Sequence, residues 1–200
     1  MDRIFHLWYY LRLWTSAAFC SAYCRVFYKF RRIKLGKKIV FIGVPFVYKF
    51  PGSTIIIGDN AEIRTSATSN LIGINRRTTL STHHQNAQIK IGDNCGMSGV
   101  VIGAKESIII GNHAVIGANV LITDFDWHAI DAAARNKGES SKSRPVTISD
   151  NVFIGTSTII LKGVHIGENA VIGANSVVTT DIPANVIAAG NPCKIVSKIK

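Results

Sequence analysis

The segment around His128 holds the residues of this 200-residue chain that are best suited to proton transfer. His128 follows Asp124 and Asp126 and precedes Asp131 and Arg135. An imidazole has an ordinary pKa of about 6.5, so near pH 7 it is mostly neutral and can accept a proton. A carboxylate at Asp126 or Asp124 can orient the ring and stabilise its protonated form. The segment therefore predicts a general base, although the same residues are also common in a solvated loop.

The elements that must position this segment follow a six-residue repeat. Aliphatic residues recur at one phase, and in the C-terminal half they are Ile148, Ile154, Ile160, Ile166, Ile172 and Val178. This period fits neither an amphipathic helix nor a long alternating strand, but it fits short strands joined by tight corners. Gly, Asn and Asp supply the corner conformations, as in Gly167-Glu168-Asn169. Stacked coils of this kind bury one continuous apolar column.

The repeat is interrupted once on a large scale, between Ile122 and Ile148. A smaller slip of one residue lies between Met97 and Ile110. A long excursion gives up repeat packing and exposes backbone, so it usually has a function. Because this excursion carries His128, we expect a catalytic loop at about 123–147.

The first 50 residues differ from the rest in composition. They hold ten Lys and Arg against Asp2 alone, a balance of +9 out of the chain's +11. Arg12 and Arg25 leave too short an uncharged run to span a bilayer, and no clean signal-peptide cleavage site follows. We expect a basic, aromatic-rich helical segment and lead-in at 1–50 and a second unit at 51–200. The helix either packs on that unit, which we favour, or contacts an anionic membrane surface.

Charge and cysteine content exclude several classes of protein. The basic excess is confined to one end, which argues against nucleic-acid binding. The four cysteines have neither metal-ligand spacing nor the density of a disulfide scaffold, so we expect a reduced, cytoplasmic setting and no metal. His83 and His84 are expected at an exposed corner, and His113 and His165 in solvated turns.

The repeat ends in two distinctive runs, Asp181-Ile182-Pro183-Ala184-Asn185-Val186 and Gly190-Asn191-Pro192-Cys193-Lys194. Together with the Ile-Gly-x-x-Ala/Val-x pattern, they resemble the hexapeptide-repeat O-acetyltransferases of the polysaccharide (colanic-acid) and maltose or galactoside type. The resemblance covers roughly Ile55 to Ile195. It implies an all-β fold, a left-handed parallel β-helix of hexapeptide repeats, behind the N-terminal helical segment. It also implies a homotrimer with active sites between subunits.

The resemblance further implies which residues form the site. It makes His128 the catalytic base, although this chain has Trp127-His128-Ala129 where relatives often have His-Pro. Acetyl-CoA is the implied acetyl donor, and the positions that match the family's coenzyme A site are Thr156, Ala174, Thr179 and Lys194. Ser98 and Arg135 are the implied acceptor-binding residues.

These observations predict an acetyl-CoA-dependent O-acetyltransferase acting on a sugar hydroxyl. We expect the acceptor to belong to a capsule, exopolysaccharide or lipopolysaccharide, with the enzyme in the cytoplasm or at the inner face of the cytoplasmic membrane. Two alternatives remain open: a small acceptor such as an antibiotic, serine or amino sugar, and a non-catalytic β-solenoid scaffold. The sequence argues against a third alternative, a carbonic anhydrase of the same fold. The last requires three zinc-binding histidines, which the spacing here does not supply.

Overall fold

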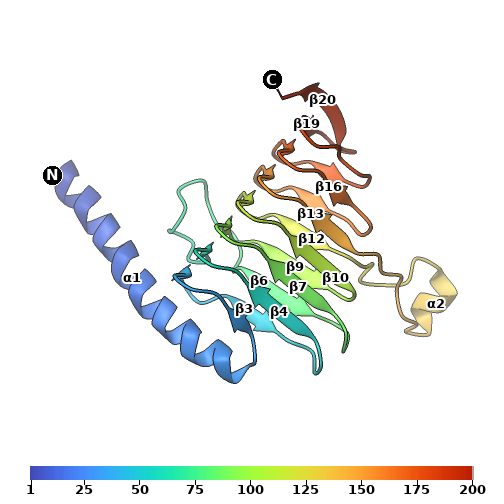
Figure 1. Ribbon diagram of the computed structural model, residues 1–200, viewed down its shortest axis with the longest axis horizontal. Helices are drawn as coiled ribbons and strands as arrows, with labels where there is room; N and C mark the ends of the chain where they lie inside the picture. Colours follow the sequence, from blue (N-terminus) through green and yellow to red (C-terminus); the bar gives the residue numbers. More distant parts are fainter. Residues whose placement is uncertain (200) are drawn as a thin grey trace.

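The structure, a computed structural model, describes residues 1–199 as a stack of short parallel strands preceded by one long helix (Figure 1). Each coil of the stack contributes one strand to each of three sheets, which form the sides of a prism. Sheet A contains β1 (Lys34–Leu35), β4 (Thr54–Ile57), β7 (Gln88–Ile91), β10 (Ser107–Ile110), β13 (Val146–Ile148) and β16 (His165–Ile166).

The other two sheets follow in order around each coil. Sheet B contains β2 (Val40–Ile42), β5 (Glu62–Arg64), β8 (Gly96–Ser98), β11 (Val115–Ile116), β14 (Phe153–Ile154), β17 (Val171–Ile172), β19 (Val186–Ala189) and β20 (Lys194–Lys198). Sheet C contains β3 (Phe46–Tyr48), β6 (Thr79–Thr82), β9 (Val101–Ala104), β12 (Leu121–Thr123), β15 (Ile159–Ile160) and β18 (Val177–Val178). All pairs are parallel except β19 with β20, which is antiparallel.

The six-residue repeat produces this prism because each aliphatic residue of the phase points into its interior. The pairing places Ile116 beside Ile154 and Ile154 beside Ile172, so the side chains form columns along the axis. These residues are at most 2% exposed. At the corners, Asn60 and Asn94 adopt the left-handed backbone conformation, with φ of 55° and 58°, which asparagine tolerates better than most residues.

The β-helix begins earlier in the chain than the repeat indicated. The strands β1, β2 and β3 form a first coil within residues 34–48, a range that the sequence analysis assigned to the lead-in. The inward residues of this coil are Leu35, Phe41 and Val47, which keep the six-residue period without isoleucine. The largest of them, Phe41, contacts Tyr28 of the helix that packs at this end of the stack.

Helix α1 (Asp2–Phe30) closes that end of the prism. Cys20, Cys24 and Tyr28 are its buried residues, four positions apart and therefore on one face. The Tyr28 ring meets the Phe41 ring edge-on at 5.9 Å, and its hydroxyl donates to the Pro45 carbonyl at 2.8 Å. Burial raises the pKa of the Cys24 thiol to about 11, so this sulfur is an inert core group.

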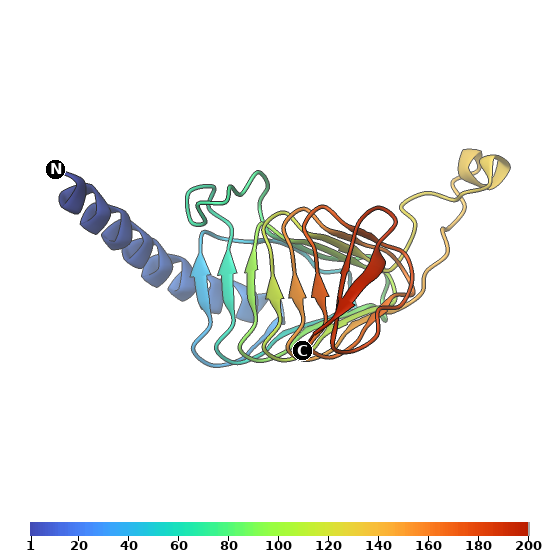
Figure 2. The same ribbon diagram turned by 90° about the horizontal axis from the view of Figure 1, so that it is seen from above.

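The first two thirds of α1 project away from the coils (Figures 1 and 2). Trp14 and Phe19 are 70% and 74% exposed. The expectation that the segment packs on the body therefore holds mainly for its C-terminal part, with one contact further out, where the Tyr9 hydroxyl donates to the Thr68 carbonyl at 3.1 Å. Within residues 1–199, no helix combines the length and the apolar character needed to cross a bilayer.

Two excursions leave the coils, at separate places in Figure 2. The sequence analysis expected one large interruption, and that one is residues 124–145, between β12 and β13, with the short helix α2 (Ala132–Asn136) at its tip. The other spans residues 65–78, between β5 and β6. It was missed because its polar run, from Ser66 to Asn70, falls where the repeat is already irregular.

Candidate active site

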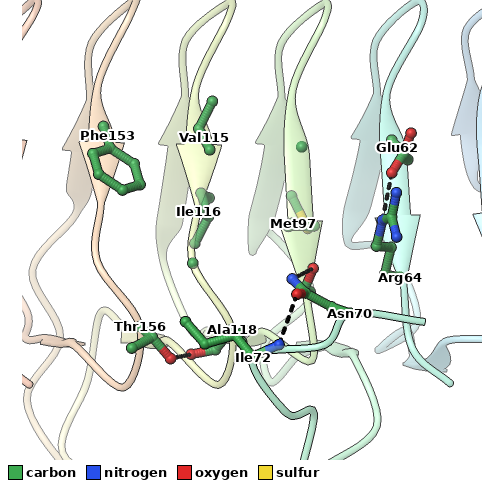
Figure 3. A pocket seen from close by; sticks show the side chains of 13 residues that line it. Glu62, Arg64, Asn70, Ile72, Met97, Val115, Ile116, Ala118, Phe153 and Thr156 are labelled. Atoms are coloured by element: carbon green, nitrogen blue, oxygen red, sulfur yellow. Dashed lines mark hydrogen bonds and ion pairs between the residues drawn. The ribbon is translucent and has the colours of Figure 1, made fainter. Parts of the chain in front are cut away.

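A groove of about 350 Å³ lies on the outer face of sheet B (Figure 3). Its floor is formed by strands β5, β8, β11 and β14, and Asn70 and Ile72 of the excursion 65–78 form one wall. The partly exposed side chains of Val115 and Phe153 make its middle apolar. The groove can therefore hold a thin ligand that is apolar along part of its length.

One end of this groove is polar. Glu62 and Arg64 form an ion pair there at 2.6 Å. The Asn70 side-chain amide donates to the Ser98 hydroxyl at 3.1 Å, and Ser98 is 6% exposed. The predicted acceptor residue Ser98 thus lies in the groove, beside Asn70, which the sequence analysis did not single out.

Small residues line the opposite end of the groove, at the corner between sheets B and C. A Cβ at Gly117 would stand 2.6 Å from the backbone nitrogen of Thr156, and a Cβ at Gly155 would stand 2.5 Å from that of Ala174. Only glycine allows the coils to approach this closely. The Thr156 hydroxyl donates to the Ala118 carbonyl at 2.7 Å, so the predicted donor-site residues Thr156 and Ala174 lie on adjacent coils of one corner.

The other two predicted donor-site residues lie elsewhere. Thr179 is exposed directly after β18 in sheet C, and Lys194 is the exposed first residue of β20, at the C-terminal end of sheet B. The single chain therefore brings together two of the four residues, Thr156 and Ala174.

The excursion that carries His128 is held at its base by a buried carboxylate. Asp124 is fully buried, and it accepts the backbone N–H groups of Lys105, Glu106 and Ser107 at 2.7, 2.8 and 2.6 Å. Burial raises the pKa of Asp124, against the lowering effect of these three donors. These three donors lie at the corner between β9 and β10, within the stretch where the repeat slips by one residue.

The second predicted carboxylate, Asp126, forms an ion pair with Lys162 on the following coil. Its backbone N–H donates to the Lys142 carbonyl at 3.2 Å, and Phe125 pairs with Ser143 in an antiparallel bridge. The two arms of the excursion are thus joined for a few residues beyond the body. Within residues 1–199, no hydrogen bond joins His128 to Asp124 or Asp126.

Beyond these arms lies the exposed His128, followed by the tip. The Asp131 side chain caps α2 by accepting the Ala134 N–H at 2.9 Å. The Arg135 guanidinium donates to the carbonyls of Ala129 and Ile130, both at 3.0 Å. Arg135, a predicted acceptor-binding residue, therefore holds the turn that follows His128.

The predicted base, His128, and the groove lie on different sides of one chain. Residues 124–145 leave between β12 of sheet C and β13 of sheet A, and the prism edge between those sheets is opposite sheet B. His128 is on this excursion, whereas Ser98 and Thr156 line the groove of sheet B. One chain alone does not place all the predicted site residues around a common cavity.

In the part of the chain that the structure describes, no three His, Cys, Asp or Glu side chains gather closely enough to hold a metal ion. The side-chain arrangement that the carbonic anhydrase alternative requires is therefore missing from those residues.

Residues 145–180 match the family described as hexapeptide repeat of succinyl-transferase. These residues of the chain form hexapeptide repeats. Its β-helix is left-handed, which confirms the expected fold class.

Several relatives are acetyltransferases. The galactoside O-acetyltransferase of Lactococcus lactis is 46% identical over 92 residues, which are 46% of this chain and 44% of the relative. The crystal structure of a hexapeptide-repeat acetyltransferase from Vibrio cholerae is 34% identical, with a TM-score of 0.53 over 56% of this chain and 63% of that one. A galactoside acetyltransferase in complex with coenzyme A is 28% identical, with a TM-score of 0.53 over 84% and 65%. The chain spans about half the length of the curated relatives that it matches.

Proposed function

We propose that this protein is an acetyl-CoA-dependent O-acetyltransferase that acetylates a sugar hydroxyl. The observation that carries the proposal is the groove of sheet B, which contains a predicted donor residue, Thr156, and the predicted acceptor residue, Ser98. The relatives include galactoside O-acetyltransferases and an acetyltransferase with bound coenzyme A, which supports the same chemistry.

The proposed reaction is acyl transfer with His128 as general base. A sugar hydroxyl is a weak nucleophile at neutral pH, so its proton must leave as the new bond forms. The imidazole accepts this proton while the hydroxyl oxygen attacks the thioester carbonyl. Collapse of the tetrahedral intermediate breaks the carbon–sulfur bond, and the departing sulfur takes the proton back from the imidazolium. The products are the acetyl ester and free coenzyme A.

The donor is proposed to lie along the small-residue corner. Pantetheine is a narrow chain with amide groups, and the exposed Ala174 and the partly buried Thr156 leave space beside the backbone. Lys194 is proposed to meet a phosphate of the nucleotide and Thr179 to contact the donor from a neighbouring copy. Ser98, held by Asn70, is proposed to contact the acceptor, and Arg135 to act through the turn that it holds.

The two predicted carboxylates are proposed to act differently. Asp126 is 27% exposed and forms one ion pair, so it can turn towards an imidazole when the loop closes on substrate. Asp124 already uses both oxygens on backbone donors. The contribution of Asp124 is to hold the start of the loop on the β-helix.

A second copy of the chain is proposed to complete each site. Sheet C carries a stripe of outward, partly buried aliphatic residues that face one another on successive strands: Val101, Leu121, Ile159 and Val177. We call this the sheet C stripe. Packing it against a neighbouring copy would bury apolar surface and carry the adjacent His128 loop towards the neighbour's sheet B. Three such contacts close a ring, which is the proposed homotrimer.

Mixing two impaired variants, at acetyl-CoA concentrations well below the raised KM of the second, tests this shared site. His128→Ala removes the base, and Ala174→Trp blocks the donor groove. In randomly mixed trimers, about a quarter of the interfaces pair an intact groove with an intact base, so about a quarter of the wild-type activity should return. A mixture as inactive as its components would show that each site lies within one chain.

Thiol release from acetyl-CoA, measured with galactosides and other sugars, tests the function itself. We expect His128→Ala to lower kcat by about 100-fold or more, the typical contribution of a general base. His113→Asn is the control, because His113 is exposed in a corner with φ of 57°, where asparagine stands in other coils. Release that needs no sugar, or that survives in His128→Ala, would contradict the proposal; no release with any acceptor would favour a scaffold.

The acceptor is proposed to be part of a surface polysaccharide, reached at the inner face of the cytoplasmic membrane. The projecting part of α1 supports this, because Phe5, Trp8 and Trp14 are exposed and Asp2 is its one acidic residue. Aromatic and basic side chains together suit the interface of an anionic bilayer. Vesicles with and without anionic lipid should float the full chain in a charge-dependent way. A deletion of residues 1–19, which keeps the buried face of α1, should lose this flotation; equal flotation would exclude lipid contact through α1.

A further inference from the structure

The residue before the proposed base is packed against the β-helix. Trp127 lies on the outer face of sheet C, over Gly103 of β9: a Cβ at Gly103 would stand 3.0 Å from Trp127 Cζ2 and 3.5 Å from Cη2. A side chain at position 103 would therefore push the indole outwards. Gly103 has an ordinary extended conformation, so its role here is to leave room.

The indole is 51% exposed and contacts two further rings, and a third ring lies beyond one of them. The Trp127 ring meets the His83 ring edge-on at 5.0 Å and an interplanar angle of 78°. Phe125 is 4.7 Å from Trp127 and 5.1 Å from His83, and Tyr48 is 6.0 Å from His83. We call Gly103, His83 and Phe125 the indole seat. Edge-on and tilted contacts at these distances are the favoured arrangements of aromatic pairs.

His83 is itself held in place. Its Nε2 lies 3.0 Å from the Ser81 hydroxyl, on the strand that precedes it. It is partly buried, which corrects the expectation that it belongs to an exposed corner. Burial lowers the pKa of His83, while the nearby Asp124 carboxylate acts in the opposite direction. At pH 7 it is therefore a neutral ring that can pack against the indole.

The seat is the last contact with the body before the base. Asp124 and Asp126 tie the loop to neighbouring coils, and Trp127 rests on the sheet. After His128, the contacts of Asp131 and Arg135 stay within the tip, and the return arm is tied to the body where Lys105 Nζ donates to the Ser140 hydroxyl and the Ser141 carbonyl. The direction in which the chain leaves the β-helix at His128 is thus set at Trp127.

We propose that the indole seat positions the catalytic base, with Gly103 and His83 as positioning residues for acyl transfer. The proposal rests on the assignment of His128 as the base. A displacement of about 1 Å at a reacting group can cost about 100-fold in rate, because the hydrogen-bond geometry to the attacking hydroxyl is lost. The packing of Trp127 would set that geometry without touching the substrate.

The first test compares Gly103→Ala with the wild type in the thiol-release assay. The methyl group displaces the indole by a few tenths of an ångström, so kcat should fall about three- to ten-fold while KM for acetyl-CoA changes less than about two-fold. The double variant Gly103→Ala/Trp127→Phe has a smaller ring over the methyl group and should regain at least part of the lost kcat. Equal kcat in Gly103→Ala and the wild type, or an equal effect on KM and kcat, would overturn the proposal.

His83 gives a matched comparison with its neighbour. His83→Ala should lower kcat, His83→Phe should keep most of it because a ring remains, and His84→Ala should match the wild type because His84 is exposed at the same corner. A loss in His84→Ala as large as in His83→Ala would overturn the role of the seat.

Tryptophan fluorescence reports on the packing of the indole seat without any catalytic turnover. Of the three tryptophans, Trp8 and Trp14 lie on the exposed part of α1 and can be replaced by phenylalanine, which leaves Trp127 as the one emitter. Protonated imidazole quenches a neighbouring indole, so emission should fall on acidification with a midpoint below about 6.5 and should not do so in His83→Phe. The Asp124 carboxylate and the Tyr48 phenol are the other titratable groups that face His83. His128 follows Trp127 directly, so His128→Ala is included in every protein of this fluorescence comparison to remove the second imidazole.

These readouts separate two failures. If the wild type is inactive but its Trp127 emission falls with pH as expected, the indole seat is present and the acyltransferase assignment is rejected. The seat would then have no catalytic role. An active wild type whose Trp127 emission ignores His83 would reject the seat alone.

Discussion

Replacing Asp124 by asparagine separates the anchoring of the loop from its chemistry. The carboxylate accepts three backbone N–H groups, one through Oδ1 and two through Oδ2. An amide has one oxygen, so at least one donor then faces an N–H group and costs about 1–3 kcal/mol. The bonds that remain lose their charge assistance, about 0.5–1 kcal/mol each. The losses add up to about 3 kcal/mol.

Burial acts against this loss. It raises the pKa of Asp124, which means that the ionised group is held in the folded protein at a desolvation cost that asparagine avoids. We therefore expect a net loss of about 2 kcal/mol. For a chain of this size, that lowers the melting temperature by about 4–8 °C at fixed protein concentration.

Asp126→Asn is the matched control, two residues away on the same loop. Its partner Lys162 and the carboxylate itself are 20% and 27% exposed, so the ion pair contributes about 1 kcal/mol or less. Calorimetry should show a shift of less than about 4 °C. A melting temperature of Asp124→Asn within about 2 °C of the wild type, or equal shifts in the two variants, would contradict the anchoring role of Asp124.

Three further predictions concern the ends, the groove and the aromatic seat. Tyr28→Ala should destabilise the protein by about 3–5 kcal/mol, because it empties the cap at Phe41, and urea unfolding would show a lower midpoint; an unchanged midpoint would mean that α1 does not close the stack. Ala174→Trp should raise KM for acetyl-CoA at least about 10-fold with an unchanged melting temperature, and an unchanged KM would move the donor elsewhere. Burial lowers the pKa of His83, so the stability that it contributes is present above its unfolded pKa of about 6.5 and is lost as pH falls through the folded value. In His83→Phe the free energy of unfolding should therefore fall less steeply below pH 6.5. Parallel pH profiles of the variant and the wild type would contradict this.

The prism was predictable from the sequence because its inward aliphatic residues recur at a fixed spacing of six. An inward residue such as Ile154 needs no knowledge of its partners: any aliphatic side chain six residues from the next finds the same interior. The first coil was not predicted because Leu35 and Phe41 keep the six-residue period but lack the isoleucine by which the repeat was recognised. The corner that carries Thr156 followed from the same regularity.

The hydrogen-bond partners of the loop were not predictable in this way. Asp124 meets backbone groups 17 to 19 positions earlier in the chain, a distance set by the length of one whole coil, including its irregular corner. Sequence proximity suggested His128 as its neighbour instead. His83 reaches Trp127 in the same manner, across two coils, and the one signal that pointed there was Gly103, a glycine in the middle of a strand.

Both open ends of the stack are covered by elements that differ from the coils. Helix α1 seals one end with Tyr28, while β20 runs antiparallel to β19 at the other, with Lys194 and Lys198 along it. An uncovered parallel edge would invite further strands from other molecules. A coil can therefore be inserted or removed between α1 and β20 without exposing either end of the stack. Gene duplication within residues 146–178 would lengthen the sheet B surface one rung at a time, a modular route by which such proteins can fit longer ligands.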